Sequence, residues 1–389
     1  FQAEDGIRDC LLSRGLGDVY KRQVVPSMND YGTLVDILKR DGETSLEERK
    51  QLAARGFRVS SHYDTMIHAH LSGEDLQGGS VEVLNLSAPD GRPLRYGENP
   101  HQKGQFFGDL DGLLKPLHGK ALSYNNLLDV DAAVQLMSEF QDDGPTFAIL
   151  KHNNACGCAT RETLEQAYID ALAGDPTSAF GGVLIANRPI DVATAHRIHE
   201  LFCEVVIAPQ FEAEAFAVLS QKKNRILLEQ QPGGLPKSTV RSALNGYLVQ
   251  ERDNAMEAAA HWTCATAQPR PECAEDLLFA LKLVKHTKSN TVVFAKDGQL
   301  LASGTGQTSR VDALNQAVEK AKRFGFDLNG SSMASDAFFP FPDCVELAAD
   351  AGVLAVIQPG GSINDEKSVA ACNARGLSMY TTGVRHFRH

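Results

Sequence analysis

The sequence lacks the long apolar stretches of a membrane protein. No run of about 18 consecutive apolar residues occurs along its 389 residues. Its first residues also lack the basic, apolar and small-residue order of a signal peptide. We therefore expect a cytoplasmic protein with no membrane partner.

Paired cysteines and an excess of positive charge are lacking as well. No C-x-x-C spacing, typical of zinc sites, is present, and disulfides are rare in the cytoplasm. The formal net charge of -11 argues against unspecific nucleic-acid binding, although a local basic pocket for a phosphate stays compatible with it. We expect free thiols, no catalytic metal and no nucleic-acid partner. The eight cysteines are Cys10, Cys156, Cys158, Cys203, Cys264, Cys273, Cys344 and Cys372.

The chain is longer than one hydrophobic core usually organises, which predicts two domains or two packed halves. Residues 1–23 show no sustained period and resemble the translated read-through of a sequencing adapter, so they are set aside from the fold. Residues 24–72 follow a helical pattern, with a capping signal of Thr44-Ser45 before Glu47-Glu48. The apolar stripe of this pattern contains Tyr31, Leu34, Ile37 and Leu38.

Strand patterns then alternate with helical ones. Residues 81–108 alternate like strands punctuated by turns, residues 124–140 form an amphipathic helical pattern, residues 146–152 read as a short buried strand, and residues 162–175 as another helix. This alternation predicts an α/β layered architecture.

A faint repeat supports two halves. "TFAILKHNN" is followed by "SAFGGVLIANRPI", and later "LVKHTKSN" is followed by "SDAFFPF" and "AGVLAVIQPGG". Each series has a Lys-His pair, a turn with phenylalanine, and an apolar strand closed by a proline turn. Such a series is what a duplicated α/β unit would leave in the sequence.

Two short stretches carry polar groups suited to chemistry. "LRYGENPHQ" places Arg95 and Tyr96 in a rigid turn, which suits a phosphate or a planar polar ligand, or is a solvated loop. In "KHNNACGC", Lys151 beside His152 at a strand end could pair an electrostatic stabiliser with a general base, or be an ordinary strand exit. A metal held by this histidine and the following C-x-C is less favoured than packing of the two thiols.

Aromatic residues on turns mark two further stretches. "DPTSAFGG" and "SDAFFPFPD" carry phenylalanines that should pack inward or line a pocket for a flat ring. Asn290 begins a strand in "KSNTVV", and "GTGQTSR" offers glycine backbone and Arg310 to an anion.

Taken together, the motifs resemble those of the bifunctional purine-biosynthesis family of phosphoribosylaminoimidazolecarboxamide (AICAR) formyltransferase / IMP cyclohydrolase. The resemblance runs from about residue 24 to the end. One departure is Ala155, where the family usually has proline, and we expect it only to loosen the turn. The resemblance rests on "LRYGENPHQ", "LSYNNLLDVDAA", "KHNNACG", "DPTSAFGG", "IAP", "KHTKSNTVVFAKDGQ", "GTGQTSR", "SDAFFPFPD", "IQPGGSIND" and "GVRHFRH".

The resemblance implies a particular fold. It implies tandem cytidine-deaminase-like α/β subdomains in residues 86–262 and 263–389, which form the formyltransferase region. Residues 24–85 would be a linker and the C-terminal helical remnant of a methylglyoxal-synthase-like cyclohydrolase domain. Most of the cyclohydrolase site would then be absent from this chain.

The resemblance also implies transfer of the formyl group of 10-formyltetrahydrofolate to the 5-amino group of AICAR, giving FAICAR and tetrahydrofolate. Lys151, His152 and Asn290 would be catalytic. The nucleotide would be bound by Arg95, Tyr96, Glu204 and Arg385, and the folate by Arg310, Phe338, Phe339, Pro340 and Asp343.

Family membership further implies a homodimer with shared active sites, and a structural potassium ion near Thr287, Ser289 and Asp336.

Two alternatives stay open. The chain could be a catalytically silent fragment, or a metal-dependent deaminase or hydrolase using His152 and its neighbouring thiols. Zinc deaminases use H-x-E and P-C-x-x-C motifs, and both are missing here.

Overall fold

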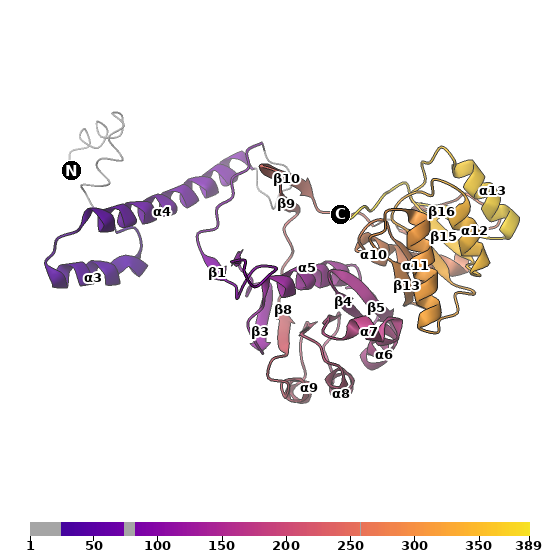
Figure 1. Ribbon diagram of the computed structural model, residues 1–389, viewed down its shortest axis with the longest axis horizontal. Helices are drawn as coiled ribbons and strands as arrows, with labels where there is room; N and C mark the ends of the chain where they lie inside the picture. The colour runs from indigo at the N-terminus through magenta and orange to yellow at the C-terminus, as the bar shows by residue number, and fades with distance from the viewer. Residues whose placement is uncertain (1–24, 74–81, 257) are drawn as a thin grey trace. The chain divides into compact units, whose positions relative to one another are not determined.

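The computed structural model describes residues 25–73, 82–256 and 258–389, and the adapter-like residues 1–23 lie outside them. The described chain divides into two compact units (Figure 1). One contains the described residues up to Arg92 together with Leu235–Arg252, and the other contains Pro93–Gly234 and Asp253–His389. In these ranges no helix has both the length and the apolar character needed to cross a bilayer.

The first unit is mainly helical, as the pattern of residues 24–72 predicts. The short 3-10 helix η1 (Met28–Asp30) leads into α3 (Tyr31–Arg40), and α4 (Leu46–Ser72) follows. The predicted cap is confirmed, because the Ser45 side chain accepts a hydrogen bond from the N–H of Glu48 and the Glu48 carboxylate accepts one from the N–H of Ser45.

The apolar stripe of the first unit is only partly covered. Ile37 is buried, whereas Tyr31 and Leu38 are 55% and 63% exposed. An antiparallel hairpin of β9 (Ser238–Ala243) and β10 (Gly246–Glu251) completes the unit, and β1 (Gly91–Pro93) lies at its boundary.

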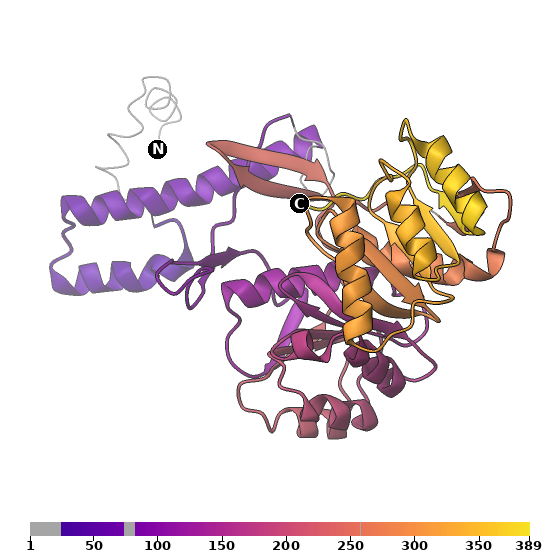
Figure 2. The same ribbon diagram turned by 45° about the vertical axis from the view of Figure 1, so that its right-hand side comes forward.

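The second unit is built on one twelve-stranded mixed sheet, so the predicted α/β class is confirmed. Figure 2 shows helices of this unit packed against its strands. The short strand β2 (Gln105–Phe107) lies outside this sheet. From edge to edge the sheet contains β11 (Thr263–Cys264), β16 (Ser378–Thr381), β15 (Ala355–Gln358), β14 (Ser332–Ser335), β12 (Val292–Lys296), β13 (Gln299–Gly304), β5 (Asn154–Thr160), β4 (Thr146–Lys151), β6 (Val183–Ala186), β7 (Val205–Ala208), β8 (Ile226–Gln230) and β3 (Leu114–His118).

The sheet contains one strand order twice. The order β5-β4-β6-β7-β8 in the first half recurs as β13-β12-β14-β15-β16 in the second, and β5 pairs with β13 where the halves meet. The first half carries helices α5 (Tyr124–Ser138), α6 (Leu164–Gly174), α7 (Pro176–Ala179), α8 (Val192–Glu200) and α9 (Ala213–Leu219). The second carries α10 (Ala274–Lys285), α11 (Arg310–Arg323), α12 (Asp343–Asp350) and α13 (Asp365–Arg375), with the 3-10 turns η2 (Ala259–His261) and η3 (Pro271–Cys273).

The register of the repeat read from the sequence is wrong. Lys151-His152 lies at the end of strand β4, but Lys285-His286 lies at the end of helix α10. The two pairs therefore do not occupy equivalent places, and the duplication lies in the order of strands and helices instead.

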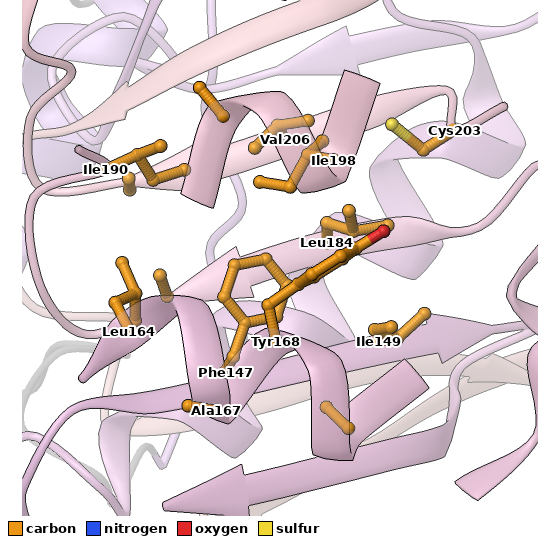
Figure 3. Close-up of a cluster of buried hydrophobic side chains, with 14 of the residues drawn as sticks. Phe147, Ile149, Leu164, Ala167, Tyr168, Leu184, Ile190, Ile198, Cys203 and Val206 are labelled. Carbon is orange, nitrogen blue, oxygen red and sulfur yellow. The ribbon is translucent and has the colours of Figure 1, made fainter. Parts of the chain in front are cut away.

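Each half has its own hydrophobic core between the sheet and its helices. In the first half, shown in Figure 3, the Phe147 ring of β4 meets the Tyr168 ring of α6 edge-on at 5.0 Å. Glycine in the second strand lets the next helix approach closely in both halves. A Cβ on Gly157 would lie 1.8 Å from the Ala171 carbonyl oxygen, and one on Gly304 would lie 1.7 Å from that of Ala313.

Candidate functional site

The stretch that joins β4 to β5 is a tight hairpin turn. Lys151 pairs with Asn154 across the two strands, so His152 and Asn153 form a two-residue loop, with φ of 50 and 67 degrees. Two-residue turns of type I′ need positive φ at both central positions, which asparagine tolerates well. The turn therefore presents His152 to solvent. Ala155, the departure from the family pattern, is buried in β5.

Asp129 on α5 fixes this turn. Its Oδ1 accepts a hydrogen bond of 2.6 Å from the N–H of Asn153. Burial raises the pKa of the Asp129 carboxyl, and the Glu204 carboxylate adds to the effect, whereas His152 and Lys151 act in the opposite direction. Two of the predicted catalytic residues therefore share one electrostatic neighbourhood with two carboxyl groups.

The Lys151 side chain reaches the turn that follows α7. Its Nζ donates a hydrogen bond of 2.6 Å to the carbonyl oxygen of Phe180. The Phe180 ring in turn packs against that of Phe202, with centroids 5.0 Å apart. The "DPTSAFGG" motif thus serves to position the Lys151 ammonium group, and the Phe180 ring itself stays 61% exposed.

Glu204 is held at the entrance to β7 by two donors. Its Oε2 accepts hydrogen bonds from Lys120 Nζ at 2.9 Å and from Asn126 Nδ2 at 3.2 Å. Burial alone would raise the pKa of Glu204, but these hydrogen bonds and the charges of Lys120 and Lys151 outweigh it and lower the pKa. The carboxylate is therefore ionised at neutral pH.

Sequence reasoning gave no role to Asp129, Lys120 or Asn126. Asp129 and Asn126 lie within "LSYNNLLDVDAA", a motif that was used only for the resemblance. The position of their side chains on one helix face, next to a strand end that is distant in sequence, depends on the tertiary fold. The available signal was the presence of polar residues in an otherwise buried helix.

The predicted nucleotide residues Arg95 and Tyr96 lie in a loop near the start of α5. The Arg95 guanidinium stacks 4.6 Å from the Tyr96 ring centroid and donates a 2.8 Å hydrogen bond to its hydroxyl. Asn125 Nδ2 ties the loop to the helix by donating to the Glu98 carbonyl at 3.1 Å. Arg95 is exposed, as a ligand-binding arginine has to be.

Asn290 lies in the second half, close to where the hairpin of the first half ends. Asn154 Oδ1 accepts a 2.9 Å hydrogen bond from the N–H of Lys288 and thus ties the two segments together. Asn290 Nδ2 donates to the Gln307 carbonyl at 3.0 Å, and its Oδ1 accepts from Arg310 Nη2 at 3.0 Å. The peptide bond between Ser289 and Asn290 is cis.

Arg310 is engaged inside the protein. Its Nη2 pairs with Asp336 Oδ1 at 2.5 Å, and its Nη1 donates to the Phe338 carbonyl at 3.3 Å. The Arg310 side chain is 8% exposed and that of Asp336 is 0% exposed. These contacts point to positioning of Asn290 and of the Phe338 backbone rather than to capture of a solvent-exposed anion.

The other predicted folate residues divide into buried and exposed ones. Phe339 is wholly buried in the second core, while Phe338 and its neighbour Phe341 are 37% and 59% exposed. The Pro340 carbonyl accepts a 2.8 Å hydrogen bond from Asn364, and Asp343 begins α12. Any flat ligand at this loop would therefore meet the exposed rings.

Arg385 lies in the C-terminal segment, where its guanidinium stacks 4.4 Å from the Phe387 ring centroid. It is exposed, and among the described residues no hydrogen bond or ion pair is found for its side chain.

One of the three residues named for potassium, Asp336, carries a buried carboxylate. Asp336 Oδ2 and Thr291 Oγ1 are buried and lack hydrogen-bond partners in the described part of the chain. Thr287 Oγ1 donates to the Leu283 carbonyl, and Ser289 Oγ accepts from the N–H of Arg388. Unpaired buried oxygens suit a cation with oxygen ligands, so this position fits one.

The cysteines of the C-x-C sequence are poor candidates for a metal site. Cys156 and Cys158 are buried, and burial raises the pKa of Cys156 to about 12 and that of Cys158 further still. The thiolate, which is the metal-binding form, is thus disfavoured. Within the described ranges the cysteines are free, and no group of three or more His, Cys, Asp or Glu residues is arranged to hold a metal ion.

Comparison with known proteins identifies the family. Residues 19–320 match the family model described as the AICARFT/IMPCHase bienzyme. The chain belongs to this bienzyme family. It is similar to the bifunctional purine biosynthesis protein PurH of Bacteroides thetaiotaomicron, with 55% identity over 94% of this chain and 71% of the relative. The PurH proteins of Chloroflexus aurantiacus and Persephonella marina are 46% and 43% identical, over 92% and 94% of this chain and 70% and 73% of the relatives.

Among solved structures, two deaminases are similar to short parts of this chain. The deaminase/reductase from Thermotoga maritima matches 27% of this chain and 34% of its own, with 22% identity and a TM-score of 0.20. The dCMP deaminase of cyanophage S-TIM5 matches 28% of this chain and 98% of its own, with 20% identity and a TM-score of 0.22.

Proposed function

We propose that this protein is an AICAR formyltransferase of de novo purine biosynthesis that uses 10-formyltetrahydrofolate as cosubstrate. Membership of the AICARFT/IMPCHase family carries the proposal. The site adds support, because Lys151 and His152 lie at one hairpin end and interact electrostatically with the carboxyl group of Asp129, as Glu204 does.

The reaction forms a bond between the 5-amino nitrogen of AICAR and the formyl carbon, and breaks the bond between that carbon and N10 of the folate. The amine loses one proton, and N10 gains one as it leaves. The amine is a weak nucleophile because its lone pair is delocalised into the imidazole ring, so proton removal and stabilisation of the tetrahedral oxyanion must both be supplied.

In our proposal His152 accepts the proton of the attacking amine. The exposed turn leaves this imidazole free to approach a substrate. Lys151 places a positive charge beside the developing charge or the leaving N10, and Asn290 donates to the formyl oxygen. In the structure without substrate, Asn290 Nδ2 donates to the Gln307 carbonyl, so it would have to exchange this partner on binding.

Substrate binding is assigned to groups around this centre. Glu204, ionised and fixed by two donors, would accept hydrogen bonds from ribose hydroxyls or the base edge. Arg95 and Arg385 would bind the phosphate of the nucleotide. The loop with the exposed Phe338 would bind the folate, and Arg310 would position that loop through its hydrogen bond to the Phe338 carbonyl. The proposed nucleotide set is Arg95, Tyr96, Glu204 and Arg385, and the proposed folate set is Arg310, Phe338, Phe339, Pro340 and Asp343.

Three further properties belong to the proposal. The two halves of the sheet would be tandem cytidine-deaminase-like subdomains, with limits near residues 86–262 and 263–389, and residues 24–85 would be the linker and methylglyoxal-synthase-like remnant. The protein would act as a homodimer in the cytoplasm. A structural potassium ion would be held near Thr287, Ser289 and Asp336 and would compensate the buried carboxylate.

The test is an absorbance assay of tetrahydrofolate formation with purified protein and 10-formyltetrahydrofolate. We expect product only when AICAR is added, and FAICAR should accumulate without conversion to IMP, since loss of cyclohydrolase activity is part of the prediction. A folded protein without AICAR-dependent turnover would overturn the formyltransferase proposal and favour a catalytically silent fragment. Conversion to IMP would overturn only the predicted loss of the second activity.

A further inference from the structure

A basic pocket borders the candidate site, and Glu204 is one of its lining residues. It has a volume of about 320 Å³ and is formed where β7 and β8 begin, with walls from the end of α8 and from the turn that precedes β8. Lys120, Lys222, Lys223 and Arg225 line it, against two acidic residues, Glu200 and Glu204. Four positive and two negative side chains leave an excess of two positive charges, in a protein whose net charge is -11.

Arg225 gives this pocket a buried positive charge without a carboxylate partner. The residue is 3% exposed, and its Nη2 donates to the Leu201 carbonyl at 2.9 Å, near the end of α8. No hydrogen bond of its Nε or Nη1 is found in the described part of the chain, no ion pair of Arg225 is found there, and the Cys203 thiol lies beside the guanidinium. A buried, incompletely satisfied guanidinium is costly unless an anion compensates its charge.

A close contact between two backbone segments also fixes the shape of the pocket. Gly119 has a φ of 101 degrees, and a Cβ there would lie 2.1 Å from the Arg225 carbonyl oxygen, so the two backbones are in close contact. This contact places Lys120 directly beside Arg225. Lys222 and Lys223 lie on the exposed rim, and no hydrogen bond or ion pair of their side chains is found among the described residues. They are available to a ligand.

We propose that this pocket binds the phosphate group of a small phosphorylated molecule. Lysine ammonium groups on flexible side chains bind phosphate as point charges, and the positive charge of the buried arginine adds electrostatic attraction. The volume lies at the lower end of the range for small-molecule sites, which suits a phosphomonoester of modest size rather than a nucleic-acid strand. Glu204 lines the pocket and also belongs to the candidate site.

The first experiment measures binding of inorganic phosphate by titration calorimetry at constant ionic strength, with chloride as the balancing anion. We expect saturable binding of one phosphate per chain. The double variant K222Q/K223Q should weaken this binding about tenfold or more, because each charge-assisted hydrogen bond contributes substantially to affinity. The control K115Q/K322Q removes the same charge from exposed lysines outside the pocket and should change the affinity less than about twofold.

Absence of saturable binding would overturn the proposal, and so would equal affinity in wild type and K222Q/K223Q, since the phosphate would then be bound elsewhere. An equal loss in both double variants would overturn it too, because it would show a general charge effect. These readouts do not depend on catalysis, so they can fail while the proposed formyltransferase activity stands.

A second arm separates two sources of the phosphate and rests on the proposed function. If the group belongs to AICAR, phosphate should compete with AICAR, and K222Q/K223Q should raise the KM for AICAR while leaving that for its unphosphorylated riboside unchanged. If it belongs to a separate ligand, K222Q/K223Q should leave the KM for AICAR unchanged. A rise in both KM values would contradict phosphate recognition by the pocket.

Discussion

At the scale of single residues, the site depends on side chains that hold others in place. Asp129 fixes the hairpin turn through Asn153, and Lys120 with Asn126 fixes Glu204. A turn with positive φ at two non-glycine positions is costly in isolation, and such a hydrogen bond helps to hold it.

Asp129 therefore has a testable positioning role. Asp129→Asn keeps an oxygen that can accept from the Asn153 N–H, whereas Asp129→Ala does not. We expect kcat to fall about tenfold or more in the alanine variant and much less in the asparagine variant, since loss of correct placement lowers the rate of the chemical step. Steady-state kinetics with both substrates would check this. Equal losses in the two variants would show that the charge, not the hydrogen bond, is what matters.

Gly157 is a position at which the fold has no space for a Cβ atom. Gly157→Ala would force β5 and α6 apart, because the new Cβ would overlap the Ala171 carbonyl. We expect the free energy of unfolding to fall by about 3 kcal/mol or more. Gly56→Ala on α4 is the matched control, since nothing lies within 4 Å of its Cβ position and alanine favours helix by about 1 kcal/mol. Urea unfolding compares the two, and a tolerated Gly157→Ala would contradict the close approach.

At the scale of elements, the ends of α5 and α10 meet in a buried charge cluster. Glu139 follows α5, and its Oε1 lies 2.7 Å from Lys285 Nζ and 2.9 Å from His286 Nε2. Burial lowers the pKa of His286 despite the Glu139 hydrogen bond, and Arg388 and Lys285 add to the effect. Burial would raise the pKa of Glu139, but its hydrogen bonds with His286 and Lys285 lower it overall.

This cluster predicts acid sensitivity. Both folded pKa values lie below their unfolded values, so the unfolded chain takes up protons first as the pH falls. The stabilisation is complete above the unfolded pKa, which is about 6.5 for histidine and about 4.5 for glutamate. For each group it is lost as the pH falls from the unfolded pKa through the lower folded pKa. We expect the free energy of unfolding to fall from pH 7 to 5 by up to about 1.4 kcal/mol per pH unit from His286.

Denaturant midpoints measured against pH would check this slope. His286→Gln should flatten the curve between pH 7 and 5, while His196→Gln, on the exposed side of α8, should leave it as in wild type. An unchanged slope in His286→Gln would place the titrating group elsewhere.

The sequence predicted some elements well and others poorly, for physical reasons. Helix α4 with its Ser45 cap, helices α5 and α6, and strand β4 follow local periodicity and capping, which a sequence shows directly. Strand β5 was missed because Asn154–Thr160 contains glycine and two cysteines and has only one β-branched residue, Thr160. Its strand conformation comes from pairing on both sides with β4 and β13.

At the scale of the second unit, its two halves share one sheet through a narrow junction. Arg161 of the first half connects it to the second half through two hydrogen bonds. Its Nη1 donates to the Asp297 carbonyl at 2.7 Å, and its Nη2 donates to Gln299 Oε1 at 3.0 Å. The sequence could suggest two halves but not this joint, because the pairing of β5 with β13 joins residues far apart in the chain. Likewise, the approach of Asn290 to the hairpin through Lys288 and Asn154 could not be read from the sequence.

Arg161→Ala should therefore uncouple the two halves. We expect the free energy of unfolding to fall by about 2–4 kcal/mol. The unfolding transition monitored by fluorescence of Trp262, the single tryptophan, should separate from the one monitored by far-UV circular dichroism. Arg188→Ala removes comparable carbonyl contacts within the first half alone and should leave the two transitions as close as in wild type. Coincident transitions in Arg161→Ala would contradict the junction.

The central claim is that formyl transfer occurs at the hairpin end that carries Lys151 and His152. The most direct measurement is AICAR-dependent tetrahydrofolate formation by wild type, Lys151→Ala and His152→Ala under identical conditions. General-base and electrostatic contributions are typically worth about 100-fold or more, so we predict turnover by wild type and losses of that order in both variants, with the fold intact by circular dichroism. Near-normal turnover by His152→Ala would contradict the account.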